Sequence, residues 1–150
     1  MKSIFAGFII VLLLASCHHT DPVEALSVNL QTFDTSAEGY FGSPGGTYSL
    51  SKQELNKGNY VISVVAGMGA DTAYMLIDTS FITLTSTGPT QVSEAKHEYI
   101  EHYANKYYDL TLDLIKTGGI DEVFFFEGLM TLKAKNSKQV TKHIFGSEGD

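Results

Sequence analysis

The 150-residue chain has one cysteine, no arginine and no apolar run long enough to cross a bilayer. A single cysteine cannot form an internal disulfide. Without arginine, the protein lacks the planar fork that binds phosphate, carboxylate or guanine through two hydrogen bonds. Its net charge of −7 opposes binding to nucleic acid and to anionic lipid. These absences disfavour a disulfide scaffold, a nucleic-acid-binding protein and a protein held on a membrane by charge.

The longest apolar run lies at the N-terminus, where Lys2 precedes residues 4–15. A run of about twelve residues is shorter than the roughly twenty that span a bilayer, and it fits the apolar region of a secretory signal. It ends in Leu14-Ala15-Ser16-Cys17, which resembles the lipobox of bacterial lipoproteins. The resemblance implies a diacylglycerol thioether on Cys17, cleavage before Cys17 and fatty acylation, such as by palmitate, of the new amino terminus. A plain signal peptide with a chance cysteine is the alternative.

This resemblance predicts a lipid-anchored protein of the bacterial cell envelope, because several acyl chains together give durable anchoring. His18, rather than aspartate, follows Cys17, which favours the outer membrane, with the protein facing the periplasm. We expect a signal peptide over residues 1–16 and a lipidated tether over residues 17–24. The signal contains Lys2 and no acid, so its removal changes the net charge from −7 to −8.

Alternation of apolar and polar residues predicts a mainly β domain over residues 25–135. The expected strands lie at 26–30, 48–50, 60–65, 73–77, 81–85, 110–114 and 123–134. The capping-box spacing of Ser51 and Glu54 predicts one helical turn. For residues 93–105 the recurrence of tyrosine at every fourth position predicts a helix, with a strand as the alternative. Residues 136–150 are expected to form a polar C-terminal tail.

Residues 48–85 are similar to β-sandwich modules of the macroglobulin and prealbumin-like kinds. The similarity rests on Tyr48-x-Leu50, on Leu55-x-x-Gly58-x-Tyr60 and on Tyr74. It implies a single β-sandwich of Ig or prealbumin-like type with one short helix. A small lipocalin-like β-barrel is the alternative fold.

The register of one hairpin follows from burial, because a shift of one residue moves every side chain to the other face. A three-residue loop pairs Leu114 with Phe124 and Leu112 with Phe126. We expect this loop, with Gly118 or Gly119 at a positive φ.

Several patterns resemble catalytic motifs but fail on spacing or composition. Asp34-Thr35-Ser36 and Asp78-Thr79-Ser80 have serine where aspartic proteases have glycine, and all three residue types form turns. His97 and His102 are five residues apart, whereas a zinc-binding helix needs a spacing of four. Gly67-Met68-Gly69 lacks the third glycine of a dinucleotide loop. We therefore expect no catalytic residue, no metal site and no cofactor.

The remaining hypothesis is a non-catalytic binding or assembly module, for example a subunit of a secretion or surface complex. Its partner would be another envelope protein, and nucleic acid is not expected to bind. Candidate interface residues are Tyr40, Phe41, Val123 and Phe125. The alternative is a lipocalin-like carrier in which a cavity for a small apolar ligand is lined by Tyr60, Tyr74, Phe124 and Phe126. A filled core favours the module, and a closed barrel with an apolar void of several hundred Å³ favours the carrier.

Overall fold

A computed structural model describes Val23 and residues 25–37, 45–67 and 70–149. The expected signal peptide, the lipidation site Cys17 and the interface candidates Tyr40 and Phe41 lie outside these described residues.

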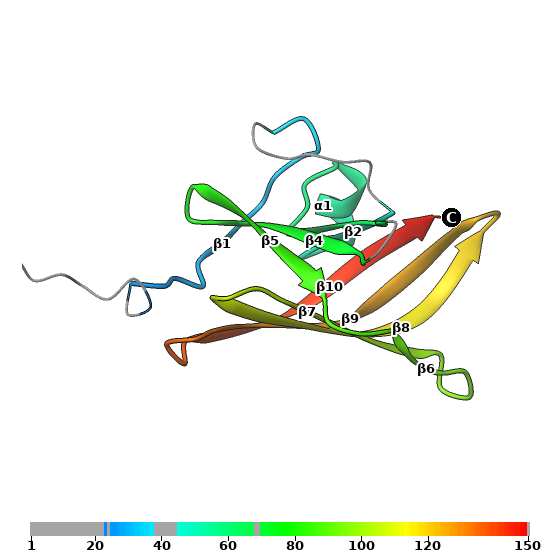
Figure 1. Ribbon diagram of the computed structural model, residues 1–150. Helices are drawn as coiled ribbons and strands as arrows, with labels where there is room; N and C mark the ends of the chain where they lie inside the picture. The colour runs from blue at the N-terminus through cyan, green and yellow to red at the C-terminus, as the bar shows by residue number, and fades with distance from the viewer. Residues whose placement is uncertain (1–22, 24, 38–44, 68–69, 150) are drawn as a thin grey trace, which may run out of the picture.

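The described chain forms ten strands and one short helix (Figure 1). The elements are β1 Leu30–Gln31, β2 Gly46–Ser49, α1 Lys52–Asn56, β3 Ile62–Val65, β4 Thr72–Ile77, β5 Ser80–Ser86, β6 Gln91–Ser93, β7 Glu98–Ala104, β8 Tyr108–Ile120, β9 Val123–Ala134 and β10 Gln139–Gly149. The predicted helical turn is confirmed, because Ser51 caps α1 and its side chain accepts a hydrogen bond from the Glu54 amide at 3.2 Å. At five residues, α1 is far too short to cross a bilayer, and no other described segment is helical.

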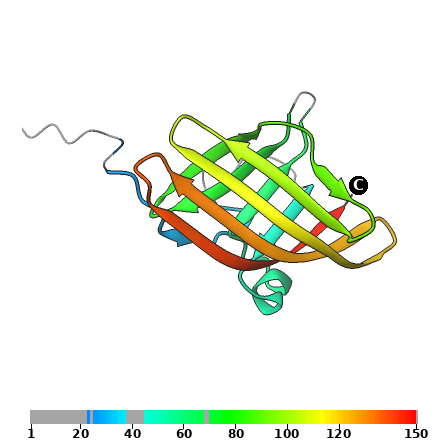
Figure 2. The same cartoon turned by 90° about the horizontal axis from the view of Figure 1, so that it is seen from below.

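Eight antiparallel strands close into a barrel in the order β4-β3-β2-β10-β9-β8-β7-β5, and β5 pairs with β4 to complete the ring (Figure 2). Strand β1 extends the pairing of β4, and β6 pairs with β7. The mainly β prediction is confirmed, and the barrel alternative is the correct one. The sandwich prediction is wrong because β5 pairs with both β4 and β7, which joins all the strands into one closed sheet.

Side chains of alternate residues fill the barrel interior. On β8 the inward residues Leu110, Leu112 and Leu114 are almost completely buried. The other strands contribute further fully buried side chains, among them Tyr48, Ile62, Met75, Leu84, Met130, Leu132 and Ile144. An eight-stranded barrel is just wide enough for its own side chains to fill it, and here much of the interior is a packed core.

The helix predicted over residues 93–105 is wrong. This segment forms the end of β6, a turn in which His97 has φ 56°, and the strand β7. Tyr99 and Tyr103 lie four residues apart, which places them on one face of a strand as well as on one face of a helix. The pairing of β7 with β8 along seven residues shows that this segment is a strand and not a helix.

The C-terminal residues also differ from expectation. In place of a polar tail, residues 139–149 form β10, which lies between β9 and β2 and completes the barrel. Its only large apolar residues besides Val140 are Ile144 and Phe145, so the sequence shows little β pattern. Pairing with β9 and β2 therefore stabilises a strand whose own residues have low β propensity.

The hairpin between β8 and β9 has a different register from the predicted one. Leu114 pairs with Gly128, and the strands continue to a two-residue turn in which Asp121 has φ 54°. Neither Gly118 nor Gly119 has a positive φ. Leu114 and Phe124 nevertheless share the inward face, as burial requires. A bulge between Lys116 and Gly118 shifts the register within the longer strands.

The two ends of the barrel are distinct, and the N-terminal segment joins one of them. Tyr108 Oη donates a hydrogen bond of 2.9 Å to the Ser27 carbonyl, and Asn136 Nδ2 donates one of 3.0 Å to the Leu26 carbonyl. Both donors belong to the end that carries the β4–β5, β7–β8 and β9–β10 turns, on the left in Figure 1. The β8–β9 turn and the C-terminal end of β10 lie at the opposite end, which we call the mouth.

Candidate functional site

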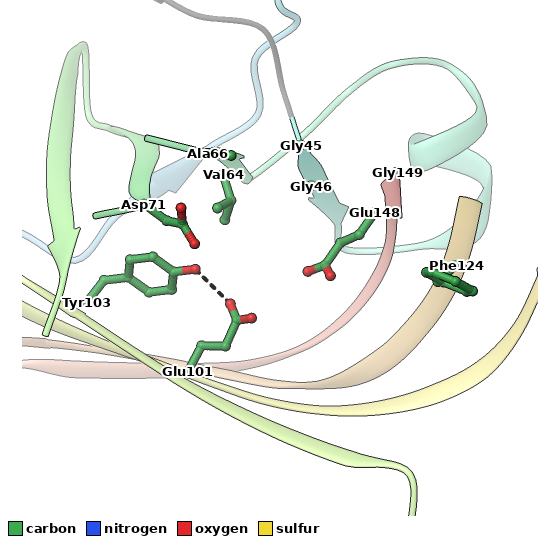
Figure 3. Close-up of a pocket in the computed structure, with 10 residues that line it drawn as sticks. All are labelled: Gly45, Gly46, Val64, Ala66, Asp71, Glu101, Tyr103, Phe124, Glu148 and Gly149. Carbon is green, nitrogen blue, oxygen red and sulfur yellow. Dashed lines mark hydrogen bonds between the residues drawn. The ribbon is translucent and has the colours of Figure 1, made fainter. Parts of the chain in front are cut away.

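A pocket of about 180 Å³ lies at the mouth (Figure 3). Six strands or their ends contribute to it, and its lining consists of Gly45, Gly46, Val64, Ala66, Asp71, Glu101, Tyr103, Phe124, Glu148 and Gly149. Three of these ten residues are acidic and none is basic. Figure 3 shows the oxygen atoms of Asp71, Glu101, Tyr103 and Glu148 turned toward the same space.

Strand alternation points two of the carboxylates into the barrel. Glu101 lies on β7 between Tyr99 and Tyr103 and pairs with the inward residue Leu112. Glu148 follows Ile144 and Gly146 on the inward face of β10. Asp71 immediately precedes β4 at the rim of the mouth, where its Oδ1 accepts a hydrogen bond of 3.3 Å from the Gly67 amide.

Two glycines give the inward side chains their room. Gly146 pairs with Tyr48 across β10 and β2, and a Cβ on Gly146 would lie 2.2 Å from Tyr48 Cδ1. Gly46 pairs with Glu148, and a Cβ there would lie 2.9 Å from Glu148 Cγ. A small residue therefore faces each large one, so the Tyr48 ring and the Glu148 side chain both fit inside the ring of strands.

Buried tyrosine hydroxyls orient two of the carboxylates. Tyr48 Oη donates a hydrogen bond to Glu148 Oε1. Tyr103 Oη donates one of 2.7 Å to Glu101 Oε2, and Thr90 Oγ1 donates a longer one of 3.3 Å to Glu101 Oε1. Burial raises the pKa of Tyr48 and of Tyr103 well above the usual range, and the nearby Glu148 and Glu101 charges raise it further. Both hydroxyls therefore keep their protons as donors.

Glu148 differs electrostatically from an ordinary surface carboxyl. Burial raises its pKa to about 7, and the negative charges of Glu101 and Asp71 add to the rise. The hydrogen bond from Tyr48 acts in the opposite direction, because it stabilises the ionised carboxylate. Near neutral pH, Glu148 is thus poised between its neutral and its charged form.

This arrangement suits a positively charged ligand. Carboxylate and hydroxyl oxygens supply acceptors from three sides, and the pocket wall includes the apolar side chains of Val64, Ala66 and Phe124. Lys116 Nζ lies 3.4 Å from the centroid of the Phe124 ring on the pocket wall. No three His, Cys, Asp or Glu side chains of the described chain are grouped so that they could hold a metal ion.

Of the residues proposed from the sequence to line a cavity, only Phe124 and Phe126 face inward. Phe126 packs edge-on against Tyr99 with ring centroids 5.4 Å apart. Tyr74 alternates with the buried Ala73 and Met75 and so faces outward, and Tyr60 packs edge-on against Phe33.

The interface candidates Val123 and Phe125 lie on the outer face of β9 and are 40% and 37% exposed. Phe125 also borders an outer groove of about 300 Å³ between α1 and strands β8 to β10, where Lys52 lies above the Phe145 ring.

The residues that resembled catalytic motifs occupy turns or the outer surface. Asp34 accepts hydrogen bonds from the amide and hydroxyl of Ser36 within its own turn. Asp78, with φ 53°, accepts a hydrogen bond of 2.9 Å from Asn29 Nδ2. On the outer face of β7, the His102 ring lies 3.2 Å from Thr111 Oγ1, whereas His97 lies in the preceding turn. None of these residues lines the mouth pocket.

Sequence reasoning missed the three carboxylates of the pocket. One signal was present: when residues 98–104 are read as a strand, Glu101 shares a face with Tyr99 and Tyr103. An acid between two aromatic residues on a buried face needs a partner or a function.

Comparison of the chain with protein-family models, with curated proteins and with solved structures found no match.

Proposed function

We propose that the protein is a lipid-anchored, non-catalytic binding protein of the bacterial cell envelope, and that its mouth pocket binds a small, positively charged organic ligand. The observation that carries this proposal is the convergence of Asp71, Glu101 and Glu148 on one pocket that no basic residue lines.

Three like charges in one partly buried pocket destabilise one another. A carboxylate removed from water is unfavourable unless it is paired, and neighbouring carboxylates oppose each other's ionisation. An ammonium group in the pocket would offset both effects, because charge-assisted hydrogen bonds are short and strong. The small pocket volume limits the size of the ligand, and the Val64 and Ala66 side chains provide contacts for its apolar part.

The same geometry argues against the alternative function, a lipocalin-like carrier of a small apolar ligand. Fully buried side chains such as Leu112 and Met130 already occupy the centre of the barrel. The pocket at the mouth is lined in part by the acidic side chains of Asp71, Glu101 and Glu148. A carrier role is retained in this proposal, but for a cationic ligand and not for an apolar one.

The place where Leu26 and Ser27 join the barrel supports an aqueous source for the ligand. The segment that leads back toward Cys17 joins the end of the barrel opposite the mouth. Lipid on Cys17 would hold that end toward the bilayer and leave the mouth facing the periplasm. Replacing Cys17 with alanine should abolish labelling by a fatty-acid probe and release the protein from membranes. Unchanged labelling would remove the lipid anchor from the proposal.

Binding can be tested by calorimetry on the mature lipidated protein in a nonionic detergent at pH 8. The probes are 1,4-diaminobutane, its neutral analogue 1,4-butanediol and the anion succinate. We expect saturable binding of the diamine alone, and a loss of about tenfold in affinity for Glu101→Gln, which keeps an acceptor for Tyr103. Asp113→Asn removes one charge from the outer face and serves as the matched control. Equal binding of diol and diamine, or no binding of the diamine, would contradict the proposal.

An assembly role is the second candidate, and exposed apolar side chains on the outer face of β8 and β9 favour it. Ile115 and Leu129 are each 46% exposed, beside the half-exposed Val123 and Phe125. The partner would be another envelope protein. Replacing both Phe125 and Leu129 with serine should shift the detergent-solubilised protein from a larger complex to the monomer in size-exclusion chromatography. An unchanged elution volume would reject this candidate.

A further inference from the structure

Glu148 occupies the point in the pocket where charged and titratable groups from several elements face one carboxyl. Gly46 on β2 leaves its side chain room, and the Phe124 ring on β9 lies beside it on the pocket wall. The groups that face it or act on it are Tyr48 from β2, Asp71 from the start of β4, and Glu101 and Tyr103 from β7. The cation Lys116 from β8 lies against the Phe124 ring.

We infer that the cationic ligand and a proton compete for Glu148, so that the pocket takes up its ligand above neutral pH and releases it when the surroundings acidify. This inference rests on the proposed function, and it adds regulation to the same site.

The geometry explains why the competition falls on Glu148. Its carboxyl is largely buried on the inward face of β10, and its Oε1 already accepts the Tyr48 hydroxyl. Burial and the charges of Glu101 and Asp71 raise its pKa to about 7, so the neutral form dominates in mildly acidic solution. A bound ammonium group would stabilise the ionised form and displace the proton to the solvent. The step is a proton transfer to water or buffer, and no covalent bond to the ligand forms.

The expected size of the effect follows from this single titration. If only ionised Glu148 binds, affinity for 1,4-diaminobutane should fall about tenfold between pH 8 and pH 6. Binding should release about 0.9 proton per ligand at pH 6 and about 0.1 proton at pH 8. Aliphatic amines titrate near pH 10, so the probe keeps its charge throughout this range.

The test is calorimetry with 1,4-diaminobutane at pH 6, 7 and 8, in two buffers with different ionisation enthalpies, on the lipidated protein in nonionic detergent. The difference between the buffers gives the number of protons released. Glu148→Gln keeps an acceptor for Tyr48 but cannot ionise, so its affinity should be weak and equal at pH 6 and pH 8. Asp113→Asn, the control, should keep the full pH dependence.

The outcomes separate this inference from the proposed function. Binding by the native protein with equal affinity at all three pH values, and without proton release, overturns the inference and leaves the proposed function standing. A pH dependence that survives in Glu148→Gln also overturns it, because another group, such as a histidine, would then be responsible. Failure of the diamine to bind at pH 8 removes both.

Discussion

At the residue scale, the depth at which Tyr48 lies in the barrel depends on the missing side chain of Gly146. The Tyr48 ring is fully buried and its hydroxyl reaches Glu148, so this pair connects the packed core to the pocket. Any side chain at residue 146 would occupy the space of the ring.

Gly146→Ala should therefore destabilise the barrel by about 1–3 kcal/mol, as overpacking of a core does. The added Cβ would lie 2.2 Å from Tyr48 Cδ1, and the ring has to move. Thermal unfolding followed by circular dichroism measures the effect. Gly88→Ala is the control, because a Cβ there meets nothing within 4 Å and should change stability by less than about 0.5 kcal/mol. Equal melting temperatures for the two variants would contradict this packing.

Glu148 should make the folded state lose stability as the pH rises. Its pKa is raised in the fold from 4.5 to about 7, so the folded state binds this proton more tightly than the unfolded state. The stability that this proton confers is present below pH 4.5 and is lost as the pH rises to about 7.

Glu148→Gln removes this titration, so the variant should be more stable than the native protein at pH 8 by up to about 3 kcal/mol, since one pKa unit corresponds to about 1.36 kcal/mol. Near pH 4 the two proteins should differ little, because Glu148 is then neutral. Urea unfolding at both pH values measures the difference. A stability difference that is the same at pH 4 and pH 8 would show that Glu148 titrates normally.

At the element scale, β10 closes the barrel between β9 and β2, although its sequence shows little β pattern. It pairs with eleven residues of β9 and four of β2. Its inward positions include Val140, Ile144, Gly146 and Glu148, of which only Val140 and Ile144 resemble core residues.

A chain that ends at Lys138 should therefore fail to fold cooperatively, because β9 and β2 would lose their shared neighbour and their inward side chains would meet water. Loss of a sigmoidal thermal transition in far-ultraviolet circular dichroism is the expected result. A chain that ends at Glu148 keeps nearly all the pairs and should unfold cooperatively. Cooperative unfolding of the shorter chain would show that the barrel does not need β10.

The strands that the sequence predicted well are those whose own alternation matches the final faces. Residues 110–114 and 123–134 lie in β8 and β9, with the expected residues of β9 inward. Residues 93–105 and 136–150 were misread, because a four-residue spacing satisfies two periods and because glycine, serine and lysine give little β signal. The pocket could not be predicted, since it joins residues 71, 101 and 148, which only the closed barrel brings together.

At the scale of the whole molecule, the barrel separates its two ends. Leu26 and Ser27 are held at one end, and the acidic pocket opens at the other. Under the proposed function, lipid on Cys17 would anchor the first end and leave the mouth facing the periplasm.

The most direct test of the account is a ¹H–¹⁵N spectrum of the protein titrated with 1,4-diaminobutane at pH 8. We predict saturable shifts concentrated on amides at the mouth, at Gly45, Gly46, Glu101, Tyr103 and Gly149. Shifts that do not saturate, or that cluster on the outer faces of α1 and β9, would contradict the assignment of the mouth as the binding site.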